Sequence, residues 1–219
     1  MKTILLVATA TLLSSCAAMN GVARKTSSTE VLGGGFPPGT SYESLESDLT
    51  RSDKVWGHFY VEARLATRGL IEAEERESGQ KTMDSEEVIN RRITERLGAL
   101  VKSRTCLLFQ LRTPIIESGY FRGYRAKLED GDGKLHDIEF ALTRGAHSVP
   151  SHIEAFHHAG FDWWNSSHGC TKKPVDTSKG FKVHFIDPAR NGGQTILYWD
   201  IKEEPEKAAP EAERTTAGK

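Results

Sequence analysis

Residues 56–66 read WGHFYVEARLA and alternate between apolar and polar side chains. The apolar set is Phe59, Val61, Ala63 and Leu65, and the polar set is His58, Tyr60, Glu62 and Arg64. Successive side chains of a β-strand point to opposite faces of the sheet. The segment is therefore predicted to be a strand with one buried and one exposed face.

Five more segments have strand character, at residues 105–111, 120–128, 135–142, 181–185 and 195–201. The turn residues Asp130-Gly131-Asp132-Gly133 and Asn191-Gly192-Gly193 join four of them into two hairpins. One amphipathic helix is expected after a cap at Asp84, with a buried stripe of Ile89, Ile93, Leu97 and Leu100. These patterns predict a mainly β, sandwich-like domain of about six strands with one helix. A compact α+β domain is the alternative.

The N-terminus has the pattern of an export signal. Lys2 precedes an apolar run at residues 4–13, and small residues then lead to Cys16. Leu13-Ser14-Ser15-Cys16 resembles the lipobox of bacterial lipoproteins. In that family the cysteine becomes the first mature residue and carries a diacylglycerol thioether and an N-acyl chain. The resemblance implies a lipid anchor at Cys16 in the bacterial cell envelope, and Ala17 implies retention in the outer membrane.

Composition divides the remaining chain into three parts. Residues 16–50 are rich in Ser, Thr, Gly and Pro and are predicted to be the lipid anchor and a flexible tether. About 34 flexible residues would reach roughly 30–35 Å. Residues 51–202 are predicted to form a single globular domain, and residues 203–219 a disordered tail.

Charge argues against a nucleic-acid partner. Lys and Arg total 29 against 30 Asp and Glu, so no excess of positive charge is present to bind a phosphate backbone. The expected partners are the membrane, through the N-terminal lipid, and peptidoglycan or another envelope protein.

Residues 143–179 form a long connection with little strand or helix pattern. Such long loops are often functional. This one holds five of the eight His residues, together with Trp163, Trp164 and Cys170. If lipid consumes Cys16, Cys106 and Cys170 remain as an even pair in an oxidising compartment, so a disulfide is expected. It would close a loop of about 64 residues and stabilise the fold by roughly 4 kcal/mol.

A catalytic alternative rests on Ser167-His168-Gly169-Cys170, which resembles the Ser/Thr-His-Gly-Cys signature of L,D-transpeptidases. The resemblance implies Cys170 as the nucleophile, His152 as the base, and His168 and Gly169 as residues that shape the site. The Thr171-Lys172-Lys173-Pro174 segment that follows departs from that family's pattern. A free Cys170 thiolate is required for this chemistry.

A metal-binding alternative rests on His147, His152 and His157, which recur at intervals of five, and on His168 close to Cys170. Zinc accepts such nitrogen and sulfur ligands. The leading interpretation is a lipid-anchored, non-enzymatic binding or structural module without a cofactor. The transpeptidase-like enzyme and the zinc-binding loop are its two alternatives.

Overall fold

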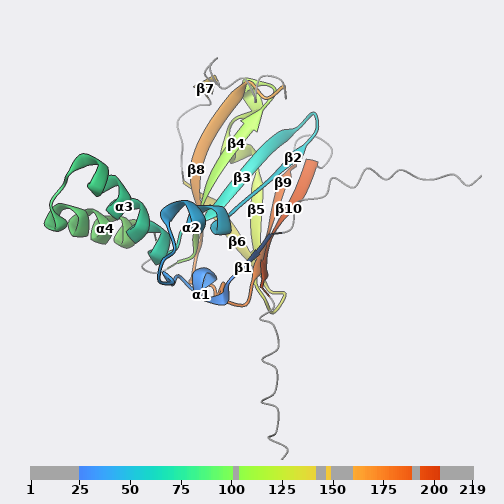
Figure 1. The fold of residues 1–219 in the computed structure, drawn as a ribbon. Helices are drawn as coiled ribbons and strands as arrows, with labels where there is room; N and C mark the ends of the chain where they lie inside the picture. Colours follow the sequence, from blue (N-terminus) through green and yellow to red (C-terminus); the bar gives the residue numbers. More distant parts are fainter. Residues whose placement is uncertain (1–24, 101–103, 142–146, 149–159, 189–192, 203–219) are drawn as a thin grey trace, which may run out of the picture.

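One large β-sheet forms most of the molecule (Figure 1). The computed structural model describes residues 25–100, 104–141, 147–148, 160–188 and 193–202. The strands are β1 (Lys25–Ser27), β2 (Thr50–Val55), β3 (Phe59–Leu65), β4 (Cys106–Thr113), β5 (Arg125–Glu129), β6 (Leu135–Phe140), β7 (His147–Ser148), β8 (Trp163–Thr171), β9 (Phe181–Asp187) and β10 (Gly193–Ile201). The helices are α1 (Thr29–Leu32), α2 (Tyr42–Leu49), α3 (Arg68–Thr82) and α4 (Glu86–Leu100), with short 3-10 turns at Ile116–Ser118 and Phe121–Gly123. The sheet order is β1-β10-β9-β5-β6-β8-β4-β3-β2, and β7 pairs with β8 off this path.

The two edges of this sheet approach each other, so that it nearly closes into a barrel. Arg51 of β2 is buried at the seam between β2 and the β1–β10 edge. Its Nε donates to the Tyr198 carbonyl of β10 at 2.7 Å, and its Nη2 donates to the Lys25 carbonyl of β1 at 3.0 Å. One guanidinium thus supplies hydrogen bonds across the gap that backbone pairing leaves open.

The interior of the barrel is filled by side chains. Its largest fully buried members include Phe59, Phe109, Phe121, Phe185 and Trp199. Several of these rings meet edge to face, as Phe59 does with Phe185 at a centroid distance of 5.2 Å. The alternation of β3 produces this arrangement directly, because every second residue from Phe59 to Leu65 is buried.

The mainly β prediction is confirmed, and each of the six predicted strands overlaps an observed one (β3, β4, β5, β6, β9 and β10). The sheet also contains β1, β2, β7 and β8, so the strand number was predicted too low. The sandwich expectation is not met, because one continuous curved sheet encloses the core in place of two facing sheets. The two predicted hairpins, β5–β6 and β9–β10, are both present.

Residues 25–50 are not a flexible tether. They form β1, α1 and α2, and they bury Val31, Leu32, Leu45 and Leu49 at 0–2% exposure. The serines that suggested flexibility include two helix N-caps, since the side chains of Ser28 and Ser41 accept hydrogen bonds from backbone N–H groups of α1 and α2. The predicted signal peptide, Cys16 and the predicted tail at 203–219 lie outside the described residues.

A helical hairpin, α3–α4, is inserted between β3 and β4 and projects sideways from the strands (Figure 1). The predicted helix is α4, and its stripe residues Ile89 and Ile93 are buried against α3. The expected cap was misplaced by one residue, because Ser85 accepts the hydrogen bond of the Val88 N–H. Helix α3 was not predicted as a helix.

Strand β8 lies within the segment predicted to be a long connection. It pairs with β4 along its whole length and also with β6, so it is an inner strand of the sheet. Its inward side chains Asn165 and Ser167 are buried but polar, which hides the usual alternation of apolar residues. The carbonyls of Gly119 and Ala141 accept their hydrogen bonds.

Candidate binding surface

Cys106 and Cys170 form a disulfide, as the sequence predicts. The two residues face each other directly across β4 and β8, with a Cα–Cα distance of 4.1 Å. The bond lies where the α3–α4 hairpin returns to the sheet, since the Ala66 N–H donates to the Cys106 carbonyl at 3.0 Å. Thr105 adds a hydrogen bond from its N–H to Thr171 Oγ1. The disulfide therefore joins two neighbouring strands and fixes the base of the hairpin.

The Ser167–Cys170 segment is extended β-strand, so its side chains alternate in direction. Ser167 faces the interior, whereas His168 is exposed on the outer face. The sulfur of Cys170 is bonded to Cys106 and is not a thiolate in this form. His152 lies outside the described residues.

Gly169 has a packing role in this strand. A Cβ atom at this position would lie 2.6 Å from Cγ2 of Ile138 and 2.8 Å from Cε2 of Phe109. Both neighbours belong to the hydrophobic core. The aromatic ring of β4 thus occupies the space that a side chain on β8 would need.

The structure does not bring the described His candidates into a metal site. Within the described ranges, no group of three or more His, Cys, Asp or Glu side chains is placed to hold a metal ion. His147 is exposed and lies against Trp164, with ring centroids 5.7 Å apart. His168 is on the same outer side of β8, four residues after Trp164. His157, like His152, lies outside the described residues.

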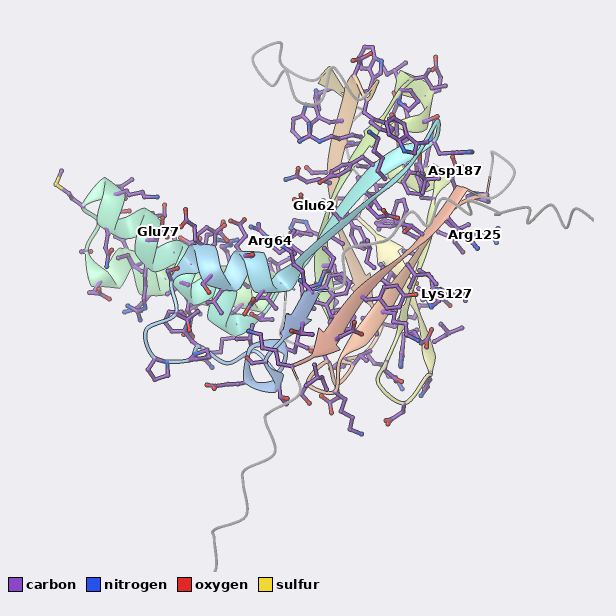
Figure 2. The ribbon with its side chains drawn as sticks, turned by 45° about the vertical axis from the view of Figure 1, so that its right-hand side comes forward. Glu62, Arg64, Glu77, Arg125, Lys127 and Asp187 are labelled. Carbon is purple, nitrogen blue, oxygen red and sulfur yellow. A yellow bond between two sulfur atoms is a disulfide. The ribbon has the colours of Figure 1, made fainter. Side chains whose placement is uncertain are left out.

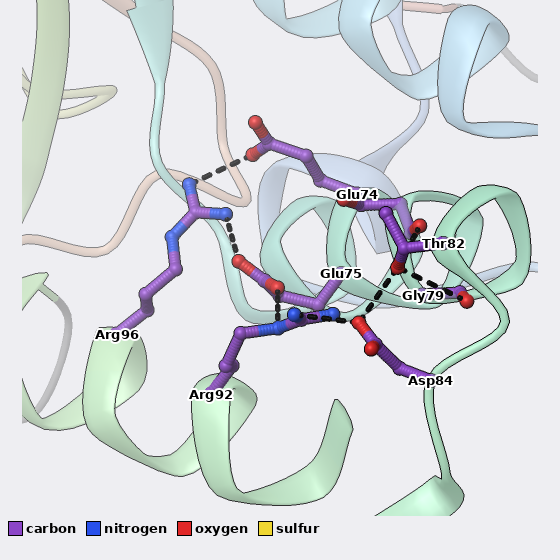
Figure 3. A network of polar contacts seen from close by, with 8 residues as sticks. Glu74, Glu75, Gly79, Thr82, Asp84, Arg92 and Arg96 are labelled. Carbon is purple, nitrogen blue, oxygen red and sulfur yellow. Dashed lines mark hydrogen bonds and ion pairs between the residues drawn. The ribbon is translucent and has the colours of Figure 1, made fainter. Parts of the chain in front are cut away.

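A network of ion pairs holds α3 against α4 (Figure 3). Arg96 donates to Glu75 Oε1 at 2.6 Å and to Glu74 Oε2 at 2.8 Å. Arg92 reaches Oε2 of the same Glu75 at 2.9 Å and Asp84 Oδ2 at 2.8 Å. Because Glu75 is only 8% exposed and forms ion pairs with both arginines, it is the centre of the hairpin's polar interface.

The outer faces of β3, β4 and β8 meet the hairpin at an angle, and we call this region the corner surface. It comprises Tyr60, Glu62, Arg64, Leu108, Gln110, Arg112, Trp164, Ser166 and His168. Figure 2 labels Glu62 and Arg64, which lie where the sheet meets the helices. The register sets three cross-strand rows: Tyr60–Arg112–Trp164, Glu62–Gln110–Ser166 and Arg64–Leu108–His168.

Charged side chains of the helices fix the end of the corner surface nearest the hairpin. Arg64 forms an ion pair with Glu46 of α2 and donates to the Tyr42 hydroxyl at 3.0 Å. Partial burial is the main cause that lowers the pKa of His168 below its ordinary value, and the positive charges of Arg96 and Arg104 lower it further. The neutral form of His168 is therefore favoured, and its ring faces the solvent.

A hollow of about 370 Å³ continues this surface toward α2 and β2. Its lining includes Glu46, Glu62 and the buried Arg51. The lining is therefore of mixed charge, which suits a polar ligand better than an apolar one.

The corner surface was not identified from the sequence. The polar alternation of β3 correctly placed Tyr60, Glu62 and Arg64 on one exposed face. Their neighbours on β4 and β8 are about 50 and 100 residues away in the chain, and only the sheet register joins them. To find the corner surface from the sequence, β8 would first have to be recognised as a strand.

No helix within the described part of the chain is long and apolar enough to cross a membrane. No family model matches the chain, and no curated protein matches it. A crystal structure of a protein of unknown function from Burkholderia pseudomallei has a similar arrangement, with a TM-score of 0.41 and 9% sequence identity. The match covers 73% of this chain and 81% of that chain. A similarity at this level supports no conclusion about function.

Proposed function

We propose that this protein is a lipid-anchored, non-enzymatic module of the bacterial envelope, held in the outer membrane through Cys16, that binds peptidoglycan with its corner surface. The row Tyr60–Arg112–Trp164 carries the proposal, because it places two aromatic rings on either side of a guanidinium on adjacent strands. Aromatic faces suit sugar rings, and a guanidinium suits the carboxylates of the peptides.

The second row of the corner surface supports the same ligand class. Gln110 and Ser166 are exposed and adjacent in the register, and Glu62 continues the row. Amide, hydroxyl and carboxylate groups at this spacing can exchange hydrogen bonds with the hydroxyls and amides of a glycan strand.

The disulfide supports a binding role over a catalytic one. With its sulfur bonded to Cys106, Cys170 stiffens the junction between the corner surface and the hairpin. Ligand recognition benefits from such a rigid surface, because less conformational freedom is lost on binding.

Co-sedimentation of the full-length lipidated protein with purified peptidoglycan sacculi tests the proposal. Trp164→Ala removes one stacking partner and is expected to weaken binding about fivefold to tenfold, since such a contact contributes roughly 1 kcal/mol. Lys127→Ala is the matched control, because Lys127 lies on the outer face of β5 away from the corner surface (Figure 2).

Equal loss of binding in both variants, or no sedimentation of the wild type, would contradict the peptidoglycan assignment. Incorporation of labelled palmitate, abolished by Cys16→Ala, separately tests the anchor. If the protein is lipidated but does not bind sacculi, the expected partner is an envelope protein.

A further inference from the structure

The row Tyr60–Arg112–Trp164 of the corner surface continues onto two further strands. Lys54 of β2 is opposite Tyr60 in the register, and His147 of β7 is opposite Trp164. The complete set Lys54–Tyr60–Arg112–Trp164–His147 therefore crosses five neighbouring strands, and we call it the extended row. Its four strand spacings of about 4.8 Å give it a length of about 19 Å.

Cationic and aromatic side chains alternate along the extended row. Tyr60 lies between Lys54 and Arg112, and Trp164 lies between Arg112 and His147. All five side chains reach the surface, since His147 is exposed and the other four are partly exposed. The pattern repeats on every second strand, which corresponds to about 10 Å. A matching ligand is a chain of about one unit per strand, with an anionic group on alternate units.

Further aromatic rings lie at both ends of the extended row. Lys54 Nζ lies 3.4 Å from the centroid of the Trp56 ring and 5.3 Å from that of Phe161. Trp56 is 64% exposed, whereas Phe161 is only 2% exposed. At the other end, the ring centroids of His147 and Trp164 are 5.7 Å apart. The ammonium group is therefore fixed beside a buried ring, and the exposed Trp56 ring lengthens the row by one aromatic group.

The charge of the extended row is positive, because its five members include Lys54 and Arg112 but no carboxylate. The carboxylate of β3, Glu62, belongs to the neighbouring row and accepts a hydrogen bond from the Tyr60 hydroxyl at 3.3 Å. The Asp53 carboxylate of β2 accepts a hydrogen bond from Thr195 of β10. Since ammonium and guanidinium groups bind carboxylates by strong charge-assisted hydrogen bonds, the row suits a ligand with spaced anionic groups.

We infer that the extended row binds a glycan strand of peptidoglycan from which the stem peptides have been removed, with the glycan lying across the β-strands. In such a glycan every second sugar carries a free lactyl carboxylate, whereas an attached stem peptide converts that carboxylate into an amide. The alternation of carboxylates matches Lys54 and Arg112, which are two strands apart. The apolar faces of the sugars stack on Tyr60, Trp164 and Trp56.

The inference rests on the proposed function and assigns the anionic group of the ligand to the glycan itself. It adds Lys54, Trp56 and His147 to the binding residues, and it sets the direction of the glycan perpendicular to the strands. The length of the row predicts that about four to five sugars fill it, at one sugar for each strand spacing of about 4.8 Å.

Fluorescence polarisation with labelled, peptide-free glycan chains tests the extended row. The full-length lipidated protein in detergent micelles is titrated with chains from a disaccharide to an octasaccharide, and we expect the affinity to rise until the row is filled and then to level off. Lys54→Ala and Trp56→Ala should each weaken binding of the octasaccharide about fivefold to tenfold and leave that of the disaccharide within about twofold. Lys134→Ala, which removes an exposed lysine of the β5–β6 turn outside the row, is the matched control and should bind like the wild type.

Two further ligands identify the source of the carboxylate. Lys54→Ala should have no effect on octasaccharides whose lactyl carboxylates are reduced to alcohols, and an equal loss with both ligands would refute the charge match. Free stem peptides that bind more tightly than the peptide-free chains would refute the glycan assignment. If the chains bind but length beyond a disaccharide adds no affinity, the proposed function stands and the extended row is refuted. If neither chains nor peptides bind, the proposed function is refuted together with the extended row.

Discussion

Removing the Cys106–Cys170 bond separates the structural from the catalytic interpretation of Cys170. The bond closes a loop with a sequence separation of 64 residues. The chain-entropy relation gives about 14 cal/mol/K for a loop of this length, or about 4 kcal/mol at 25 °C. The double variant Cys106→Ala/Cys170→Ala should therefore unfold about 4 kcal/mol more easily than the wild type. A catalytic thiol predicts the opposite result, with activity lost and stability nearly unchanged.

Urea unfolding followed by circular dichroism measures this difference. With a urea dependence of about 2 kcal/mol/M, the midpoint should fall by about 2 M. The wild type measured in a reducing agent should shift in the same direction, because it loses the same constraint. Ser166→Ala, an exposed change on the same strand, is the control and should leave the midpoint in place. A shift below about 0.5 M, with both thiols alkylated before reduction, would refute the structural role.

Three further outcomes are expected. Glu75→Gln removes the carboxylate that two arginines of the α3–α4 network share, and it should lower the free energy of unfolding by about 1–3 kcal/mol, measured by thermal unfolding. We expect a smaller loss than for a fully buried ion pair, because the arginine partners are about a third exposed. Glu77→Gln, which breaks only the exposed pair with Lys81, should change stability by a few tenths of a kcal/mol, and equal effects would contradict the network. Gly169→Ala should cost about 1–3 kcal/mol by overpacking, and Phe109→Leu should recover part of that cost in a double-mutant cycle; full additivity would exclude the packing role. The pKa of His168, followed by NMR titration, should lie below its unfolded value of about 6.5, so its contribution to stability is complete above that pH and is lost as the pH falls through the folded pKa. A pKa at or above the unfolded value would refute this environment.

The local sequence pattern was sufficient to predict a strand wherever one face of the strand is apolar and a turn follows it. β3 shows this, because each of its inward residues is apolar and each outward one is polar. The β5–β6 hairpin was equally clear, since the Asp130–Gly133 turn separates two strand segments. Here the burial of a segment and its local sequence agree.

The local sequence pattern failed to predict those elements whose structure depends on contacts with residues distant in the sequence. β8 was missed because its buried inward residues Asn165 and Ser167 are polar and bond backbone carbonyls. At Gly169 the Phe109 ring fills the space that a side chain would need. Helices α1 and α2 are short and polar overall, and they are held by only a few buried residues, such as Leu45 and Leu49. No composition window distinguishes such a segment from a flexible spacer.

The candidate surface shows the same division. The disulfide could be predicted, because Cys106 and Cys170 form an even pair once Cys16 is expected to carry lipid and the compartment is expected to be oxidising. Its location between adjacent strands could not, since it depends on the register of β4 against β8. The Tyr60–Arg112–Trp164 row depends on the same register. The information that assembles the surface is therefore long-range.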